Sequence, residues 1–206
     1  MVAPPARILQ LDALSDLELH HVNAELVTYR GRHAVRLVEQ EEPSTDAQSI
    51  AILSGSDFKD GAIETEIAGA PRKDAPQDAR GFVGIAFRVH PHGSRFECFY
   101  LRPTNGRAND QLRRNHSTQY VSHPEYPWFR LREEKSGAYE SYTDLVPGAW
   151  TPIRIVVSGI RAQLHVNGAE QPCLVVNDLK LGETRGQIAL WIGGGTEAYF
   201  SKVVVK

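Results

Sequence analysis

The strongest constraint on the fold of this chain is a two-residue alternation of apolar and polar side chains that recurs in short runs. One run alternates isoleucine or threonine with glutamate, at Ile63, Glu64, Thr65, Glu66 and Ile67. This pattern is typical of a strand with one buried face and one face in water. Further runs, rich in β-branched and aromatic residues, cover 81–89, 95–101, 152–159, 162–166 and 186–193. Turn-forming residues separate most of them, and no amphipathic helix of three turns is found. The sequence therefore predicts an all-β protein.

Three local patterns predict how the strands are joined. Asn167 and Gly168 lie between two strand-like runs and predict a tight hairpin turn, because a type I′ turn needs positive φ at both central residues. The glycines at 193–195 also join two strand-like runs, which favours a turn over a phosphate loop leading into a helix. Residues 197–206 are predicted to pair with strands near the N-terminus and so to close a sheet.

Composition and charge narrow the class of protein. With 206 residues, of which 41% are hydrophobic, the chain is expected to form a single domain over 1–206. Its 23 basic and 25 acidic residues nearly balance, which argues against a nucleic-acid-binding protein. No run approaches the roughly 18 apolar residues that cross a bilayer, so no membrane segment is expected. The first residues lack the pattern of a signal peptide, which predicts either a cytoplasmic protein or a processed secreted form.

The cysteines and histidines do not predict a metal site. Cys98 and Cys173 are too few for a disulfide framework and lack the paired spacing of a structural zinc site. We expect inert core cysteines, with one long-range disulfide as the alternative. A histidine cluster would need the strand to continue through Pro91, but proline there favours a turn; its members would be His90, His92, His116 and His123.

Several segments, in this order along the chain, resemble the concanavalin A-like lectin/glucanase superfamily. They are DFKDGAIETEI, GFVGIAFRV, RFECFYLRP, GAWTPIRIVVSGIRAQLHVNGAE and GQIALWIGGGTEAYFSKVVVK. The resemblance covers residues 50–206 and is strongest to laminin G-like modules and to the bacterial domain labelled 3-keto-disaccharide hydrolase-like. It implies a jelly-roll sandwich of two curved antiparallel sheets, with ligands on the concave face or its rim loops. The alternating strands independently favour a two-sheet sandwich.

Two long segments interrupt the predicted strands. Residues 68–80 are rich in alanine, proline and charge and predict a surface loop. The stretch 103–148 combines polar residues with aromatic ones and predicts a functional loop region, because structureless loops of this length are uncommon in compact domains.

Residues 102–132 include six arginines but only two acids, in a chain that is acidic as a whole. Arginine can bind a carboxylate or sulfate through two parallel hydrogen bonds, and aromatic rings can stack on the apolar side of a sugar ring. We therefore predict a site for an acidic or modified saccharide, with arginine fixing orientation and Tyr120 and Trp128 stacking. The predicted ligand-binding residues are Arg102, Asn105, Asp110, Gln111, Arg113, Arg114, Asn115, His116, Tyr120, Trp128, Arg130 and Tyr142.

The sequence offers only weak candidates for catalysis. Glycosidases need two carboxylates across the scissile bond, and the Glu-x-Asp-x-Glu pattern of the superfamily's glucanases is missing. Glu64 and Glu66 would share one strand face, at a spacing that permits catalysis, but two glutamates on a solvated face are the favoured interpretation of the pattern. The acid/base candidates are Glu64, Glu66, Glu97 and His116. No cofactor is predicted; a structural calcium ion stays open, with Asp12, Asp16 and Asp144 as its candidate ligands.

The leading interpretation is thus a carbohydrate-binding domain. The alternatives are a glycoside hydrolase or lyase acting on a modified disaccharide, and a non-catalytic protein-interaction module. Nucleic-acid binding is disfavoured, because the arginine-rich segment holds no lysine and the whole chain is acidic. The sequence leaves the oligomeric state open.

Overall fold

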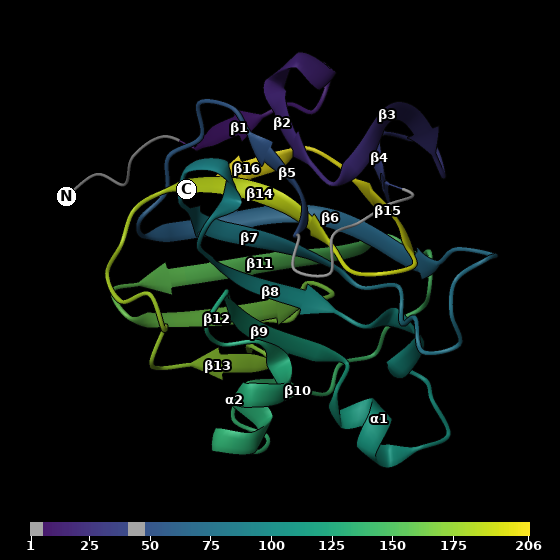
Figure 1. Cartoon of the computed structure of the whole chain (residues 1–206), viewed down its shortest axis with the longest axis vertical. Coiled ribbons are helices and arrows are strands. Elements are labelled where there is room, and N and C mark those ends of the chain that lie inside the picture. The colour runs from purple at the N-terminus through teal and green to yellow at the C-terminus, as the bar shows by residue number, and fades with distance from the viewer. Residues whose placement is uncertain (1–5, 41–47) are drawn as a thin grey trace.

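The computed structural model describes residues 6–40 and 48–206, and its strands form two packed antiparallel sheets (Figure 1). The nine-stranded sheet runs β13 (Leu174–Val176), β12 (Arg161–Val166), β11 (Thr151–Ser158), β6 (Gly61–Pro71), β15 (Thr196–Phe200), β4 (Arg32–Glu39) and β3 (Val22–Tyr29), and β16 (Val203–Val205) joins β6 to β1 (Arg7–Leu9). The seven-stranded sheet runs β10 (Glu140–Ser141), β9 (Thr118–His123), β8 (Phe96–Leu101), β7 (Val83–Val89), β14 (Gln187–Ile192), β5 (Ser49–Leu53) and β2 (Leu17–His20). This arrangement confirms the predicted all-β jelly-roll sandwich.

Helical structure in the described residues is short. The α-helices are α1 (Gln111–Asn115) and α2 (Trp128–Glu134), which lie beyond one edge of the sandwich in Figure 1. Single 3-10 turns cover Leu14–Asp16, Pro91–Gly93 and Pro103–Asn105. No helix in this part of the chain has the length and apolar character needed to cross a bilayer.

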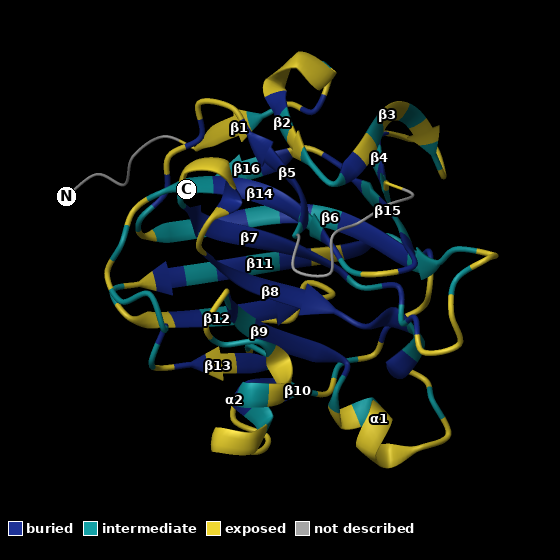
Figure 2. Ribbon diagram, viewed as in Figure 1, coloured by how far each residue is buried: buried dark blue, intermediate teal, exposed yellow. Residues whose placement is uncertain are grey.

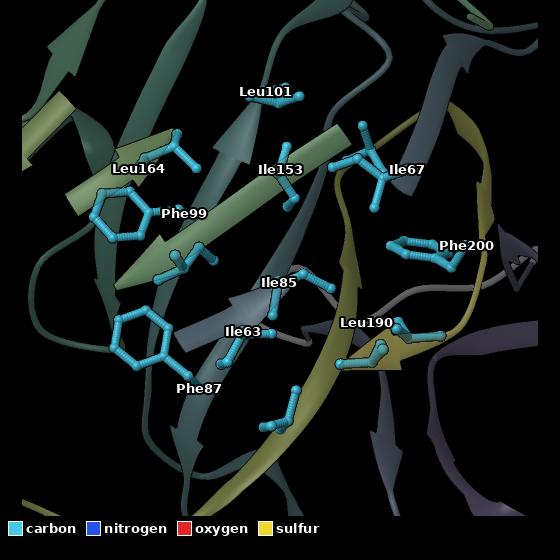
Figure 3. Close-up of a cluster of buried hydrophobic side chains, with 14 of the residues drawn as sticks. Ile63, Ile67, Ile85, Phe87, Phe99, Leu101, Ile153, Leu164, Leu190 and Phe200 are labelled. Carbon is cyan, nitrogen blue, oxygen red and sulfur yellow. The ribbon is translucent and has the colours of Figure 1, made fainter. Parts of the chain in front are cut away.

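The core lies between the sheets, where alternate side chains of each strand meet. Ile63 and Ile67 of β6 point inward, as the alternation predicts, and pack with Phe87 and Phe99 of the opposite sheet (Figure 3). A second, smaller buried cluster covers the outer face of the seven-stranded sheet and includes Cys98. Strands β5, β7 and β8 are therefore buried along both faces, which Figure 2 shows as continuous dark blue.

The predicted connections can be compared with the structure directly. Asn167 and Gly168 have φ of 58° and 72°, and the Ala169 amide donates to the Val166 carbonyl oxygen at 3.2 Å, which confirms the tight turn. The loop that connects the two strands is longer than predicted, because the β12–β13 pair nearest the turn is Leu164 with Leu174. The turns at Pro91 and at 193–195 are confirmed, as is pairing of the chain end, through β15 with β4 and through β16 with β1.

Two predictions about loops are wrong in part. The stretch 103–148 is not one irregular region, because β9 runs through it as an interior strand between β8 and β10. Its sequence, TQYVSH, has too few apolar residues to be identified as a strand by hydrophobicity. Strand β6 also continues to Pro71, so the loop predicted at 68–80 begins only after it.

Both cysteines are free. Cys98 is fully buried, and burial raises the pKa of its thiol well above the ordinary value, as expected for an inert core cysteine. Cys173 is partly buried, and burial raises its pKa to about 11.

The turn at Gly168 makes a direct test of the fold. A Cβ at this position would meet no atom within 4 Å, so Gly168→Val should act through backbone strain alone and lower the free energy of unfolding by about 1 kcal/mol or more. Gly168→Asn is the matched control, because asparagine tolerates positive φ. Denaturant unfolding of both variants measures the difference; equal stability would show that positive φ is not required here.

Candidate functional site

Two aromatic rings meet over a glycine on the outer face of the seven-stranded sheet. In the strand register, Gly84 of β7 lies between Tyr100 of β8 and Trp191 of β14. Because glycine has no side chain, the two rings close over it and stack, with centroids 4.7 Å apart. A Cβ on Gly84 would come within 2.6 Å of the Tyr100 Cβ. The absence of a side chain at Gly84 is therefore a condition for this stack.

A groove of about 280 Å³ surrounds the stack. Its aromatic lining consists of Phe82, Tyr100, His123, Trp128 and Trp191. The Phe82 ring meets Tyr100 edge-on at 6.1 Å. Gln48 also lines the groove, and its Oε1 accepts a hydrogen bond from the Trp191 Nε1 at 3.2 Å. An apolar groove with a few polar groups is the usual form of a small-molecule site.

Helix α2 brings Trp128 to the groove. The chain turns back after β9, where Ser122 and Tyr126 pair through their backbones, and α2 begins directly after Pro127. Leu131, which is fully buried, anchors the helix to the core. Trp128 in the first turn remains 43% exposed, so its ring is available to a ligand.

A charged cluster adjoins the aromatic groove. Arg102 is 7% exposed and donates to the Tyr100 hydroxyl at 3.0 Å and to the Gln119 Oε1 at 3.2 Å. Beside it, the Glu140 carboxylate, 4% exposed, accepts two hydrogen bonds from Arg132, at 3.0 and 2.6 Å. The His116 Nε2 lies 3.2 Å from the same carboxylate. Multiple charge-assisted hydrogen bonds fix these groups in place.

The same cluster supports Trp128. The guanidinium carbon of Arg132 lies 4.8 Å from the centroid of the Trp128 ring, and that of Arg102 lies 6.0 Å from it. Both contacts are within the range of cation–π attraction. The polar cluster and the aromatic groove are therefore one connected structure.

Burial shifts the pKa of several groups at the site. It lowers the pKa of His116, an effect that Arg132 and Arg102 increase and Glu140 opposes. Burial also lowers the pKa of His123 and raises that of Tyr100 to about 12. Both imidazoles and the phenol are thus neutral near pH 7, which suits hydrogen bonding to uncharged hydroxyl groups.

The structure brings some predicted ligand-binding residues together at this site. Arg102 and His116 belong to the cluster, and Trp128 lines the groove. Asn105 is buried beneath them and donates to the His116 carbonyl oxygen at 3.1 Å. Arg113 lies outside the groove, in a second depression next to Arg80.

The other predicted residues lie elsewhere. Tyr120 is the clear correction: its ring is fully buried between the sheets, where its hydroxyl donates to Glu97 at 2.6 Å, because even-numbered residues of β9 face the core. The rest make local contacts: Asp110 caps α1, Gln111 pairs with Asn115, Arg114 with Tyr142, and Arg130 with Glu134.

The catalytic candidates do not form a pair at the groove. Glu97 is fully buried in the core, and burial raises its pKa. Glu64 and Glu66 do share a face, but it is the outer face of the other sheet, where they pair with Lys206 and Arg32. They line a separate depression of about 520 Å³. Of the four candidates, only His116 adjoins the groove.

The candidate metal ligands also lie apart. His92 contacts Glu18 at 3.1 Å whereas His116 contacts Glu140, and Asp144 is bound by Arg107. Throughout residues 6–40 and 48–206, no group of three or more His, Cys, Asp or Glu side chains is arranged to hold a metal ion.

Sequence reasoning missed half of the site. Phe82, Tyr100 and Trp191 stand in runs that are apolar enough to be interpreted as core, and Glu140 is not among the predicted site residues. One signal was available: the alternation places Tyr100 on the strand face opposite Phe99. Only the strand register brings it beside Trp191.

The fold is shared with solved structures. No protein-family model and no curated protein sequence matches the chain. A Bacillus subtilis protein of unknown function with a galectin-like fold is similar with a TM-score of 0.62 at 11% identity, over 98% of this chain and 94% of that one. The Ca²⁺/Man-bound exoplasmic/lumenal domain of VIP36 is similar with a TM-score of 0.59 at 11% sequence identity, over 93% of this chain and 82% of that one. The carbohydrate-binding module CBM66 from Bacillus subtilis is similar with a TM-score of 0.58 at 12% sequence identity, over 93% of this chain and 98% of that one. At these identities the likeness is one of fold, and the class is a galectin-like β-sandwich.

Gly84→Ala tests the construction of the groove. The new methyl group would collide with β8 and separate Tyr100 from Trp191, so we expect a loss of about 1–3 kcal/mol in the free energy of unfolding and a reduced near-ultraviolet circular dichroism signal. Gly55→Ala is the control, because a Cβ there meets no atom within 4 Å and its positive φ carries only backbone strain. Equal effects of both changes would contradict the assigned role of Gly84.

The pH dependence of His123 tests its environment. In the unfolded chain, His123 takes up its proton near the ordinary histidine pKa of about 6.5, whereas in the folded chain it does so only at lower pH. The contribution of His123 to stability is therefore complete above pH 6.5 and is lost as the pH falls. The wild type should lose stability relative to His123→Asn between pH 7 and pH 5, and the NMR titration of the imidazole should have its midpoint below 6.5. A midpoint at or above 6.5 would contradict the burial argument.

Proposed function

We propose that this protein binds a saccharide in the groove around Tyr100 and Trp191. The observation that supports this most is the union of an aromatic surface with a fixed polar cluster. Aromatic faces stack on the apolar side of a sugar ring, and polar groups that line the groove, such as those of Gln48 and His123, can hydrogen-bond neighbouring hydroxyls. The cluster is already held in place before a ligand arrives, which lowers the entropic cost of binding.

Two further observations support this proposal. One solved structure with the same fold is described as a carbohydrate-binding module, and another was determined as a Ca²⁺/Man-bound form. His116, His123 and Tyr100 are neutral near pH 7, as argued above, which suits a ligand rich in hydroxyl groups. We extend the proposal to an acidic or modified saccharide, because two arginines, Arg102 and Arg132, face a single carboxylate at the groove.

Binding is favoured over hydrolysis. No aspartate or glutamate lines the groove in the described part of the chain, and the neighbouring Glu140 is held by arginine. Glycoside hydrolysis by the usual mechanism needs two carboxylates on opposite sides of the bond. A carbohydrate-binding domain therefore needs fewer assumptions than a hydrolase.

Tryptophan substitutions test the proposed function. A glycan array first identifies a ligand, and Trp191→Ala and Trp128→Ala should then each weaken its binding by about 30-fold, which corresponds to the roughly 2 kcal/mol of a binding hot spot. Trp150→Ala is the matched control, because Trp150 packs against Tyr29 away from the groove. Glu64→Gln and Glu66→Gln should also leave binding unchanged. The measurement is isothermal titration calorimetry.

Three results would contradict the proposal. Release of reducing sugar that Glu140→Gln lowers by about 10²-fold would indicate an enzyme. Binding of no glycan, together with a protein partner lost on Trp128→Ala, would indicate a protein-interaction module. Affinity for nucleic acid that falls steeply with salt would indicate a nucleic-acid-binding protein.

A further inference from the structure

A depression of about 500 Å³ lies between the β6–β7 loop and α1, apart from the one that Glu64 and Glu66 line. Two arginines and one acid are among its six lining residues. The lining residues are Gln77, Asp78, Ala79, Arg80, Thr104 and Arg113. Arg80 belongs to none of the residue sets predicted from the sequence.

Uncharged acceptors hold both arginines in place. The Arg80 Nη1 donates to the carbonyl oxygens of Gln77, at 2.8 Å, and Ala79, at 3.1 Å. The Arg80 carbonyl oxygen in turn accepts from the Thr104 amide at 3.3 Å, which ties the loop to the segment after β8. The Arg113 Nη2 donates to the Asn105 Oδ1 at 3.4 Å. These bonds position the guanidinium groups without neutralising their charge.

The contrast with nearby arginines is direct. Arg107, Arg130 and Arg132 each form an ion pair with a carboxylate, at 2.6–2.7 Å. Within the described ranges, neither Arg80 nor Arg113 has a carboxylate oxygen closer than 4.0 Å. Burial lowers the pKa of Arg80, and the positive charges of Arg113 and Arg102 lower it further against the opposing effect of Asp78. The three guanidinium groups therefore repel one another, and a bound anion would relieve that repulsion.

The depression adjoins the saccharide groove. Phe82, two residues after Arg80, lines the groove. Arg102 contacts Tyr100 of the groove on one side, and its charge acts on Arg80 on the other. A ligand that extends from the groove past Arg102 would reach Arg80 and Arg113.

We propose that Arg80 and Arg113 form an anion subsite of the groove, which binds the carboxylate or sulfate group of an acidic oligosaccharide. The inference rests on the proposed function and adds to it the residues that bind the anionic group of the ligand. The neutral part of the ligand stacks in the groove, and its anionic group lies in the depression. Guanidinium groups suit both anions, because they donate parallel hydrogen bonds to two oxygens.

The experiment compares three oligosaccharides with the same backbone, one neutral, one carboxylated and one sulfated, by calorimetry. We expect the wild-type protein to prefer an anionic form. Arg80→Gln and Arg113→Gln should each weaken binding of that form by roughly 10- to 150-fold, the range for hydrogen bonds to charged groups, and should leave the neutral form within about twofold. Arg→Lys should recover part of the loss. Arg107→Gln is the control, since it removes an equal charge from an arginine paired with Asp144.

A second measurement does not depend on the groove. Titration with inorganic sulfate and with glucuronate should shift the side-chain NMR signals of Arg80 and Arg113, but not that of Arg107. Equal affinity of wild type for neutral and anionic forms, or equal losses from Arg107→Gln, would overturn the subsite while leaving the proposed function intact. If Trp191→Ala abolishes saccharide binding but sulfate still shifts the NMR signals of Arg80 and Arg113, the result would support a groove and an anion subsite that bind independently. Absence of both saccharide binding and sulfate shifts would overturn both proposals.

Discussion

Burial of the two apolar inner faces is the interaction on which the rest of this structure depends. Ile63 and Ile67 from one sheet and Phe87 and Phe99 from the other are inaccessible to water, and such side chains supply most of the favourable free energy of folding. Because successive side chains of a strand alternate between faces, burying Phe99 forces Tyr100 outward. A slip of one residue would move Tyr100 into the space between the sheets and Phe99 to the outer face, so the core also fixes the register of the groove.

Among the described residues, two charged side chains are buried completely, and both join loops to the seven-stranded sheet. Arg88 donates to the carbonyl oxygens of Lys59, Gly159 and Gly182 as well as to Asp60. Glu97 accepts from Tyr120 and from the Leu181 amide. Buried charges are costly unless hydrogen-bonded, and here the bonds attach the loops at 159 and 181–182 to β7 and β8. Both side chains lie away from the groove.

The arginine-rich segment shows why charge has to be considered together with its partners. Arg107, Arg130 and Arg132 are each paired with an acid, and that acid lies up to 37 residues away along the chain. In the part of the chain that the structure describes, Arg113 has no such partner and instead faces Arg80 from a different loop. The excess charge available to a ligand is thus smaller than the composition suggests.

The sequence by itself determined the local features of this protein. Alternation predicted the strands and the faces of Ile63, Glu64 and Ile67, and Asn167-Gly168 predicted its turn, because these depend on backbone preferences and on neighbours a few residues away. Trp128, Arg102 and His116 were also identified as candidates, since their residue types suit the chemistry. The tertiary structure alone decided that β9 is an interior strand, that Tyr120 faces the core, and that Tyr100 meets Trp191 over Gly84. Those outcomes depend on pairing between strands far apart in the chain, which residue type and local periodicity do not encode.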